Sequence, residues 1–228
     1  MTTRSQTFGI SVGSIFATGI RGFLANPIPI FLAGAATIGV YLAFRIPAQA
    51  AANETRLIIS LALDLTGLVV ASVVSYPWYS YALAAGDGKP VDVAAPFRNF
   101  DRFTTQAVAS FWFWAGVLLG VRYLYGIPAI VALLFYAFYG YVIADGVTLS
   151  GLKALGHSAR LGEGKRVGMF AIGALLFAFN FFGAIAIGFT LNALTIALAV
   201  IGFTLTSSIT LVGGAAIYRT FSEALEQK

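Results

Sequence analysis

The sequence has no cysteine, a single histidine and few charged residues. Without cysteine the chain cannot have a disulfide framework, a thiol nucleophile or a cysteine-ligated metal. One histidine, His157, cannot build a histidine-rich metal site. The sequence also lacks a glycine-rich phosphate loop and a cluster of metal ligands. We therefore expect no cofactor, no metal and no catalytic residues, and we do not expect an enzyme.

The shortage of charge also indicates the class of protein. Charged residues make up 10% of the 228 residues, hydrophobic residues make up 59%, and the mean hydropathy is +0.86. An average soluble domain carries roughly 25% charged residues, which its surface needs. The apolar excess must face lipid, so the composition predicts a polytopic membrane protein. The net charge of +5 then fits positive residues retained at the cytoplasmic face, and no nucleic-acid partner is expected.

Six stretches are long and apolar enough to cross the hydrocarbon core as helices, which takes about 20 residues. They do not alternate as transmembrane strands would. We predict an all-α, six-helix transmembrane bundle that forms one domain over residues 1–228. The predicted spans are 27–44, 57–84, 105–125, 127–144, 167–190 and 193–218.

Prolines mark several of the predicted boundaries. Pro27 and Pro128 stand at the starts of spans, where a missing N–H has no helical partner to lose. Pro47 is expected to end the first span. Pro77 lies inside the second span, which predicts a kink or a break at Tyr76.

The positions of lysine and arginine predict the orientation in the membrane. With the N-terminus inside, eleven of the 14 lysines and arginines are cytoplasmic, Arg4 and Lys228 among them. Only Arg45, Arg56 and Arg122 remain outside. This bias predicts that both termini are cytoplasmic. The uncharged turn from Phe189 to Asn192 fits a tight external hairpin.

Three segments beside the spans carry apolar residues at helical spacing, with their charges on other faces. They are 8–24, 93–103 and 149–161, and each predicts an amphipathic helix in the cytoplasmic interface. The chain then consists either of three units, each an interfacial helix followed by a helical hairpin, or of ordinary spans joined by amphipathic linkers.

The segment from Pro128 to Gly168 has a distinctive order of residues. A proline-initiated span ends in an acidic residue, a short helix follows, and a glycine-basic segment enters the next span. The residues in these places are Asp145, Ala154, Leu155, Ser158, Gly164, Lys165 and Arg166. This order resembles the membrane domain of bacterial glycerophosphodiester phosphodiesterases and related uncharacterised six-helix membrane proteins. Gly156 and Ala159 stand where that family usually has a basic residue and a tryptophan.

The resemblance implies a six-helix protein of the cell (cytoplasmic) membrane of a prokaryote. The earlier segment GDGKPVDVAAPFRNFDRF, from Gly86, is similar to the family's cytoplasmic entry into the third span. The resemblance implies no catalysis, because the phosphodiesterase activity of the family resides in a separate soluble domain that is not in this sequence.

Asp64 is the most unusual residue within a predicted span. It follows Arg56 by about 12 Å of helix and so lies near mid-membrane, where a charged aspartate costs roughly 2.5–3.5 kcal/mol. Arg122 and Arg45 are its candidate partners. Asp64 is therefore either half of an ion pair that joins helices or a proton- or cation-linked site.

Further polar candidates lie within the last two spans and near the membrane surface. Asn180, Thr206 and Thr210 can bond across helices or line a polar cavity. Four cations are candidate contacts for anionic lipid headgroups. They are Lys153, Arg160, Lys165 and Arg166.

These observations favour a non-enzymatic membrane protein that acts through its surface. It would be an accessory, scaffold or assembly subunit, or would organise lipid. The expected partners are membrane lipids and another membrane protein or a second copy of the chain. The alternative is a small transporter or channel that uses Asp64 and the hydroxyl-rich sixth span.

Overall fold

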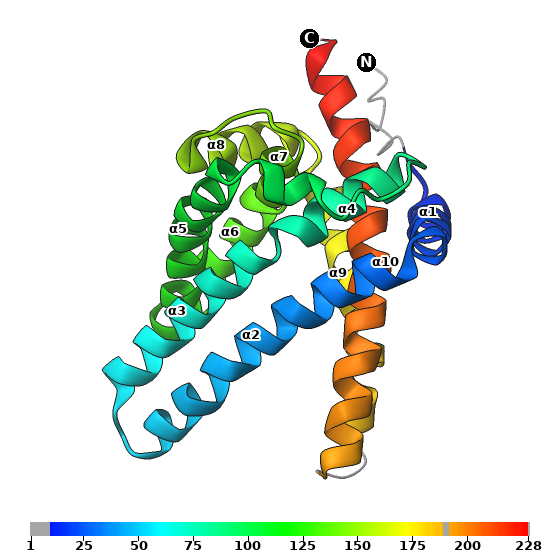
Figure 1. Ribbon diagram of the computed structural model, residues 1–228. Helices are drawn as coiled ribbons and strands as arrows, with labels where there is room; N and C mark the ends of the chain where they lie inside the picture. Colours follow the sequence, from blue (N-terminus) through cyan, green and yellow to red (C-terminus); the bar gives the residue numbers. More distant parts are fainter. Residues whose placement is uncertain (1–9, 189–191, 228) are drawn as a thin grey trace.

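The computed structural model describes residues 10–188 and 192–227, and every regular element within these ranges is a helix (Figure 1). In chain order they are α1 (Val12–Ala25), α2 (Pro27–Asn53), α3 (Leu57–Val74), α4 (Tyr76–Gly86), η1 (Ala95–Arg98), α5 (Asp101–Tyr123), α6 (Ile127–Tyr136), α7 (Tyr139–Ala144), α8 (Gly151–Leu161), α9 (Arg166–Gly183), η2 (Ile185–Gly188) and α10 (Ala193–Glu226). Six stretches are long and apolar enough to cross a membrane, which confirms this part of the predicted fold class.

Some sequence predictions fall outside the described residues. Residues 8–9 of the first predicted amphipathic helix and residues 189–190 of the fifth predicted span are among them, as are Arg4 and Lys228. The described part of the first amphipathic helix begins later than predicted, at Val12, where the Ser11 side chain accepts a hydrogen bond from the Ser14 N–H. The sides of the membrane on which the termini lie stay a prediction.

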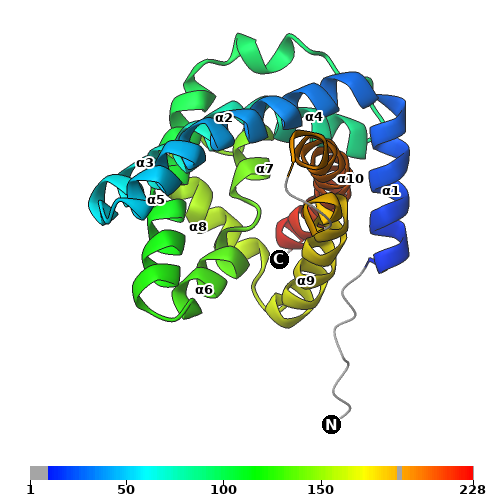
Figure 2. The same cartoon turned by 90° about the horizontal axis from the view of Figure 1, so that it is seen from below.

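The six spans form a closed ring. Each span contacts the next in the order α2, α3, α5, α6, α9 and α10, and α10 returns to α2. Figure 2 looks nearly along α10 and shows this ring, with α1 lying across its outside against α10. The amphipathic helices α1 and α8 and the C-terminal end of α10 lie toward one end of the molecule, opposite the α2–α3 connection (Figure 1).

Two of the six spans are broken, and their second halves turn into the ring. The predicted break near Tyr76 is confirmed: α3 ends at Val74, and α4 begins at Tyr76 with Pro77 in its first turn. The predicted single span 57–84 is therefore wrong beyond residue 74, because α4 changes direction there (Figure 1). The fourth span breaks at Ala137–Phe138, which the sequence did not predict, and α4 contacts α7.

Other boundaries differ from the prediction for identifiable reasons. The first span does not end before Pro47, because α2 continues through this proline to Asn53. A proline removes one N–H donor, and a transmembrane helix tolerates this where the rest of its ladder stays intact. The predicted amphipathic helix 93–103 is wrong: residues 95–98 form the short turn η1, and residues 101–103 are already the first turn of α5. The carboxylate of Asp101 favours a helix start there.

Glycines let the spans approach closely. Two glycines of α5, one at a close contact and one in open space, allow this to be tested. A Cβ on Gly120 would lie 2.7 Å from the backbone N of Ala129 in α6, whereas a Cβ on Gly116 would meet nothing within 4 Å. We expect Gly120→Ala to lower the free energy of unfolding by about 1–2 kcal/mol through overpacking. Gly116→Ala should be neutral or stabilising, because alanine has the higher helix propensity. Thermal unfolding in detergent measures both, and equal effects would contradict the close α5–α6 contact.

Candidate functional site

The ring of spans surrounds an open cavity of about 620 Å³. Every span contributes to its wall, which is mainly aromatic and aliphatic. The polar residues of the wall, tryptophans apart, are Thr37, Tyr41, Ser72, Ser75, Tyr79, Tyr136, Tyr139, Asn180, Ser207 and Thr210. None of the residues that line it is aspartate, glutamate, lysine, arginine or histidine. The cavity is therefore suited to an uncharged molecule with a small polar group.

Both helix breaks lie in the wall of this cavity. Ser75 stands at the first break and Ala137 at the second, and both residues line the cavity. Irregular backbone at membrane depth is tolerated only where it is buried in protein or lines a cavity. The two breaks therefore belong to the architecture of the cavity.

Hydroxyl groups hold the first break in place. The Ser75 hydroxyl donates to the C=O of Ser72 at 2.7 Å, and the indole N–H of Trp114 in α5 donates to the Ser72 hydroxyl, also at 2.7 Å. Tyr139 in α7 and Ser110 in α5 share a further hydrogen bond of 3.1 Å. Polar side chains thus join α3, α5 and α7 along one side of the cavity.

Ser158 in α8 bridges the second break. Its buried hydroxyl accepts from the N–H of Phe138 at 3.0 Å and donates to the C=O of Phe135 at 3.1 Å. These backbone groups lie on either side of the break in the fourth span. Ser158 therefore supplies hydrogen bonds that a continuous helix would have made for itself.

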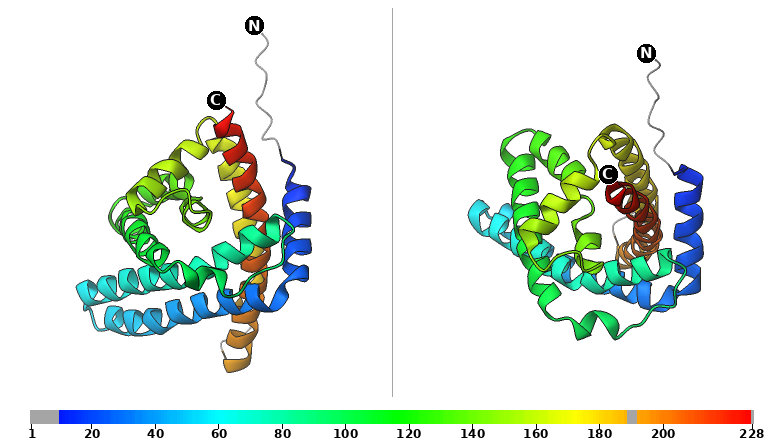
Figure 3. Two further views of the ribbon diagram at one scale, coloured as in Figure 1. Left: turned by 45° about the horizontal axis from the view of Figure 1, so that its top comes forward. Right: turned by 90° about the horizontal axis from the view of Figure 1, so that it is seen from above.

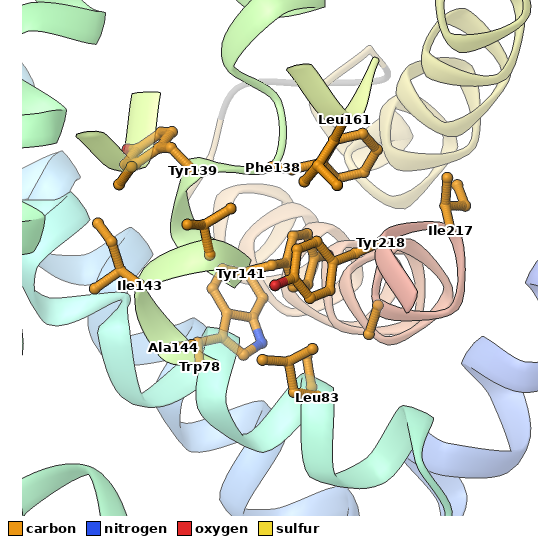
Figure 4. Packing of buried hydrophobic residues seen from close by; sticks show 14 of the residues in the cluster. Trp78, Leu83, Phe138, Tyr139, Tyr141, Ile143, Ala144, Leu161, Ile217 and Tyr218 are labelled. Carbon is orange, nitrogen blue, oxygen red and sulfur yellow. The ribbon is translucent and has the colours of Figure 1, made fainter. Parts of the chain in front are cut away.

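An aromatic layer forms where α4, α7 and α10 meet. The rings of Tyr141 and Tyr218 are stacked with their centroids 5.6 Å apart, and Tyr79 meets Tyr141 edge-on at 5.0 Å. The Tyr141 hydroxyl donates to the C=O of Leu211 at 2.6 Å. Figure 4 shows Tyr141 and Tyr218 overlapping, with Phe138 nearby. Of these rings, Tyr79 also lines the cavity.

An ionic cluster lies next to this aromatic layer. The Arg219 guanidinium donates through Nε and Nη2 to Asp87 at 2.9 Å, and through Nη1 to Asp145 at 2.8 Å. The Tyr218 hydroxyl donates to the same Asp145 carboxylate at 2.9 Å. In Figure 3 the end of α10 that carries Arg219 lies among α4, α7 and α8. One arginine therefore ties together the ends of both inward-turned half-helices.

The sequence carries a signal for this cluster that our prediction did not use. Asp87 is the C-cap of α4 and Asp145 is the C-cap of α7, and each is followed by a glycine with positive φ, Gly88 or Gly146. The two broken spans thus end in the same Asp-Gly pair. A carboxylate at a helix C-terminus is disfavoured by the helix dipole, so each aspartate needs a cation such as Arg219.

Of the two partners predicted for Asp64, the structure brings one to it. Arg45 Nη1 lies 2.9 Å from Asp64 Oδ2 and 3.0 Å from Oδ1, which joins α2 to α3. Arg122 makes no such contact and is exposed near the end of α5. Asp64 does not line the cavity.

The polar candidates in the last two spans have different environments. Asn180 Nδ2 donates to Thr210 Oγ1 at 3.2 Å, and the Thr210 hydroxyl donates to the C=O of Ser207 at 3.0 Å. Asn180 and Thr210 line the cavity, so this pair joins α9 to α10 at its wall. Thr206 instead donates to the C=O of Gly202 one turn earlier in its own helix, at 3.1 Å.

The four candidate headgroup cations separate into two pairs. Lys165 lies over the ring of Phe221 at 4.3 Å, and the Arg166 guanidinium lies 3.6 Å from the ring centroid of Phe135. Both therefore pack against aromatic rings of the protein. Lys153 and Arg160 are exposed on α8. Between them lies His157, whose pKa is lowered by burial and by the nearby charge of Arg160.

Comparisons of this chain with protein-family models, with curated proteins and with solved structures found no match. The resemblance to the membrane domain of glycerophosphodiester phosphodiesterases therefore stays a prediction. The structure shows an all-helical chain with six stretches that could cross a membrane.

Proposed function

We propose that the protein is a non-enzymatic, multi-pass membrane protein that binds an uncharged amphiphile, such as a membrane lipid, inside its ring of six spans. The observation that carries the proposal is the central cavity, whose wall contains both helix breaks and no charged side chain. Discontinuous spans mark binding sites in other membrane proteins, because they bring polar groups to mid-membrane.

The wall of the cavity also supports entry from the bilayer. Phe177 in α9 lines the cavity and is nevertheless 73% exposed, and Leu133 in α6 and Phe203 in α10 are partly exposed wall residues as well. A residue that faces both the cavity and the outside lies at an opening. This opening faces the apolar surface of the spans, so a hydrophobic molecule can enter without leaving the membrane.

The transporter alternative finds less support at the predicted residue. Asp64 is paired with Arg45 and lies outside the cavity wall, so a proton or cation bound there would not meet a molecule in the cavity. Roles as an accessory or scaffold subunit, or as a homo-oligomer, stay predictions of the sequence and are compatible with lipid binding.

Filling the cavity should displace the bound amphiphile. Gly173 lines the cavity and has open space at its Cβ position, so Gly173→Phe places a ring in the opening without a backbone clash. We expect the purified variant to retain severalfold less co-purified lipid than the wild type, measured by native mass spectrometry and by extraction of the lipid.

Gly39→Phe is the matched control, because Gly39 also lies in a span with open space at its Cβ position but does not line the cavity. It should retain lipid as the wild type does. Equal retention by both variants would mean that the lipid only coats the outer surface, and absence of tightly held lipid from the wild type would also overturn the proposal.

A further inference from the structure

Three basic side chains share the outward face of α8. Lys153, His157 and Arg160 stand at positions i, i+4 and i+7, which are neighbours on one face of a helix. All three line one surface hollow, and Gly156 lies between them. The opposite face of α8 is buried through Ala154, Leu155, Ser158 and Leu161, so the fold fixes which side chains point outward.

The residues that line this hollow suit an anion. Side chains on a helix lean toward its N-terminus, so the three basic groups point toward Thr148, which also lines the hollow. A Cβ on Gly156 would meet nothing within 4 Å, so a ligand can approach the helix backbone there. The Thr148 hydroxyl accepts from the N–H of Ser150 at 3.1 Å, which leaves its own proton free to be donated.

No acidic side chain of the described residues neutralises this face. The chain from Gly146 to Gly162 contains no aspartate or glutamate, and Asp145 before it is held by Arg219. Glu163 follows directly, is exposed, and forms no ion pair with Arg160 in the part of the chain that the structure describes. Lys153 and Arg160 form no ion pair in the part of the chain that the structure describes. By contrast, the exposed Arg98 pairs with Asp92.

We infer that this face of α8 binds the phosphate group of an anionic lipid headgroup, at a site separate from the central cavity. Apolar side chains beside the cations identify the lipid as the source of the phosphate. Val147, Leu149 and Leu152 are exposed next to the hollow, at 46%, 64% and 58%. They can enter the acyl region while Lys153 and Arg160 remain at headgroup level, as in an interfacial amphipathic helix.

Binding of phosphatidylglycerol and phosphatidylcholine of equal chain length to the delipidated protein in detergent tests this inference. Native mass spectrometry counts the bound lipid. We expect a preference for phosphatidylglycerol that falls about fivefold when either Lys153 or Arg160 is removed, and about 25-fold in the double variant Lys153→Gln/Arg160→Gln. Gly156→Leu fills the centre of the hollow without changing charge, and it should also abolish most of the preference.

Two controls distinguish binding at this site from general electrostatic attraction of anionic lipid to the protein. Arg21→Gln/Arg98→Gln removes two exposed cations from other elements and should leave the preference unchanged. Gly39→Phe should also leave it unchanged, because that position lines neither the cavity nor the hollow on α8. The inference is overturned if both lipids bind equally, if Gly156→Leu has no effect, or if the two double variants behave alike. Saturable binding of inorganic phosphate that the α8 variants lose would make free phosphate the ligand and overturn the lipid assignment.

Discussion

Replacing Arg219 by methionine is expected to lower the free energy of unfolding by about 2–3 kcal/mol. The substitution takes from Asp145 its ion-pair partner among the described residues and leaves Asp87 only the exposed Lys89, at 3.4 Å. The Asp87 and Asp145 side chains are only 17% and 25% exposed. Removing one partner of a buried ion pair costs about 3–5 kcal/mol, and we expect less here because water still reaches both carboxylates. Both also lie at helix C-termini, where a negative charge is disfavoured. Thermal unfolding in detergent should shift down by about 5–10 °C.

Arg98→Met is the matched control for the Arg219 substitution. Arg98 pairs with Asp92 at 3.1 Å, but these side chains are 68% and 52% exposed. An exposed pair contributes about 0–1 kcal/mol, so this variant should melt close to the wild type. Adding Asp145→Asn to Arg219→Met should recover part of the lost stability, because it removes one unpaired carboxylate. Similar losses in the two arginine variants, or no recovery in the double variant, would contradict the proposed role of the cluster.

The positions of the spans could be predicted from the sequence, because length and hydropathy are local properties. The break beside Pro77 was also predictable, since a proline removes an N–H wherever it stands in a helix. The same argument failed at Pro47, where α2 continues unbroken. A missing donor weakens a helix, but tertiary packing decides whether the helix bends, breaks or continues.

The break at Ala137–Phe138 was not predictable by the same means, because no proline or glycine stands at it. The group that stabilises it, the Ser158 hydroxyl, comes from another helix, 20 residues beyond Phe138. The residues of the ionic cluster are even farther apart in the sequence, since Arg219 bonds to Asp87, which lies 132 residues earlier. For Asp64 the sequence limited the partner to two arginines, and only the packing of α2 on α3 selects Arg45.

Ser158→Ala is expected to lower the free energy of unfolding by about 2–3 kcal/mol, although it removes a single oxygen atom. The N–H of Phe138 and the C=O of Phe135 both lose the partner that Ser158 provides. A buried polar group left without a hydrogen bond costs about 1–3 kcal/mol, and water cannot replace the serine easily because its side chain is fully buried. The melting temperature in detergent should fall by at least about 5 °C.

The control for Ser158→Ala is Thr220→Val. This substitution removes a hydroxyl that bonds only within its own helix. The Thr220 hydroxyl donates to the C=O of Ala216 within the unbroken helix α10, whose own backbone bonds remain after the substitution. We expect a change below about 1 kcal/mol for this variant.

Ser158→Cys keeps a weak donor and acceptor, so it should melt between the wild type and Ser158→Ala. Because the break that Ser158 bridges lies in the cavity wall, Ser158→Ala should also retain less lipid than Thr220→Val. A Ser158→Ala protein with wild-type stability and lipid content would show that the break in the fourth span does not depend on this serine.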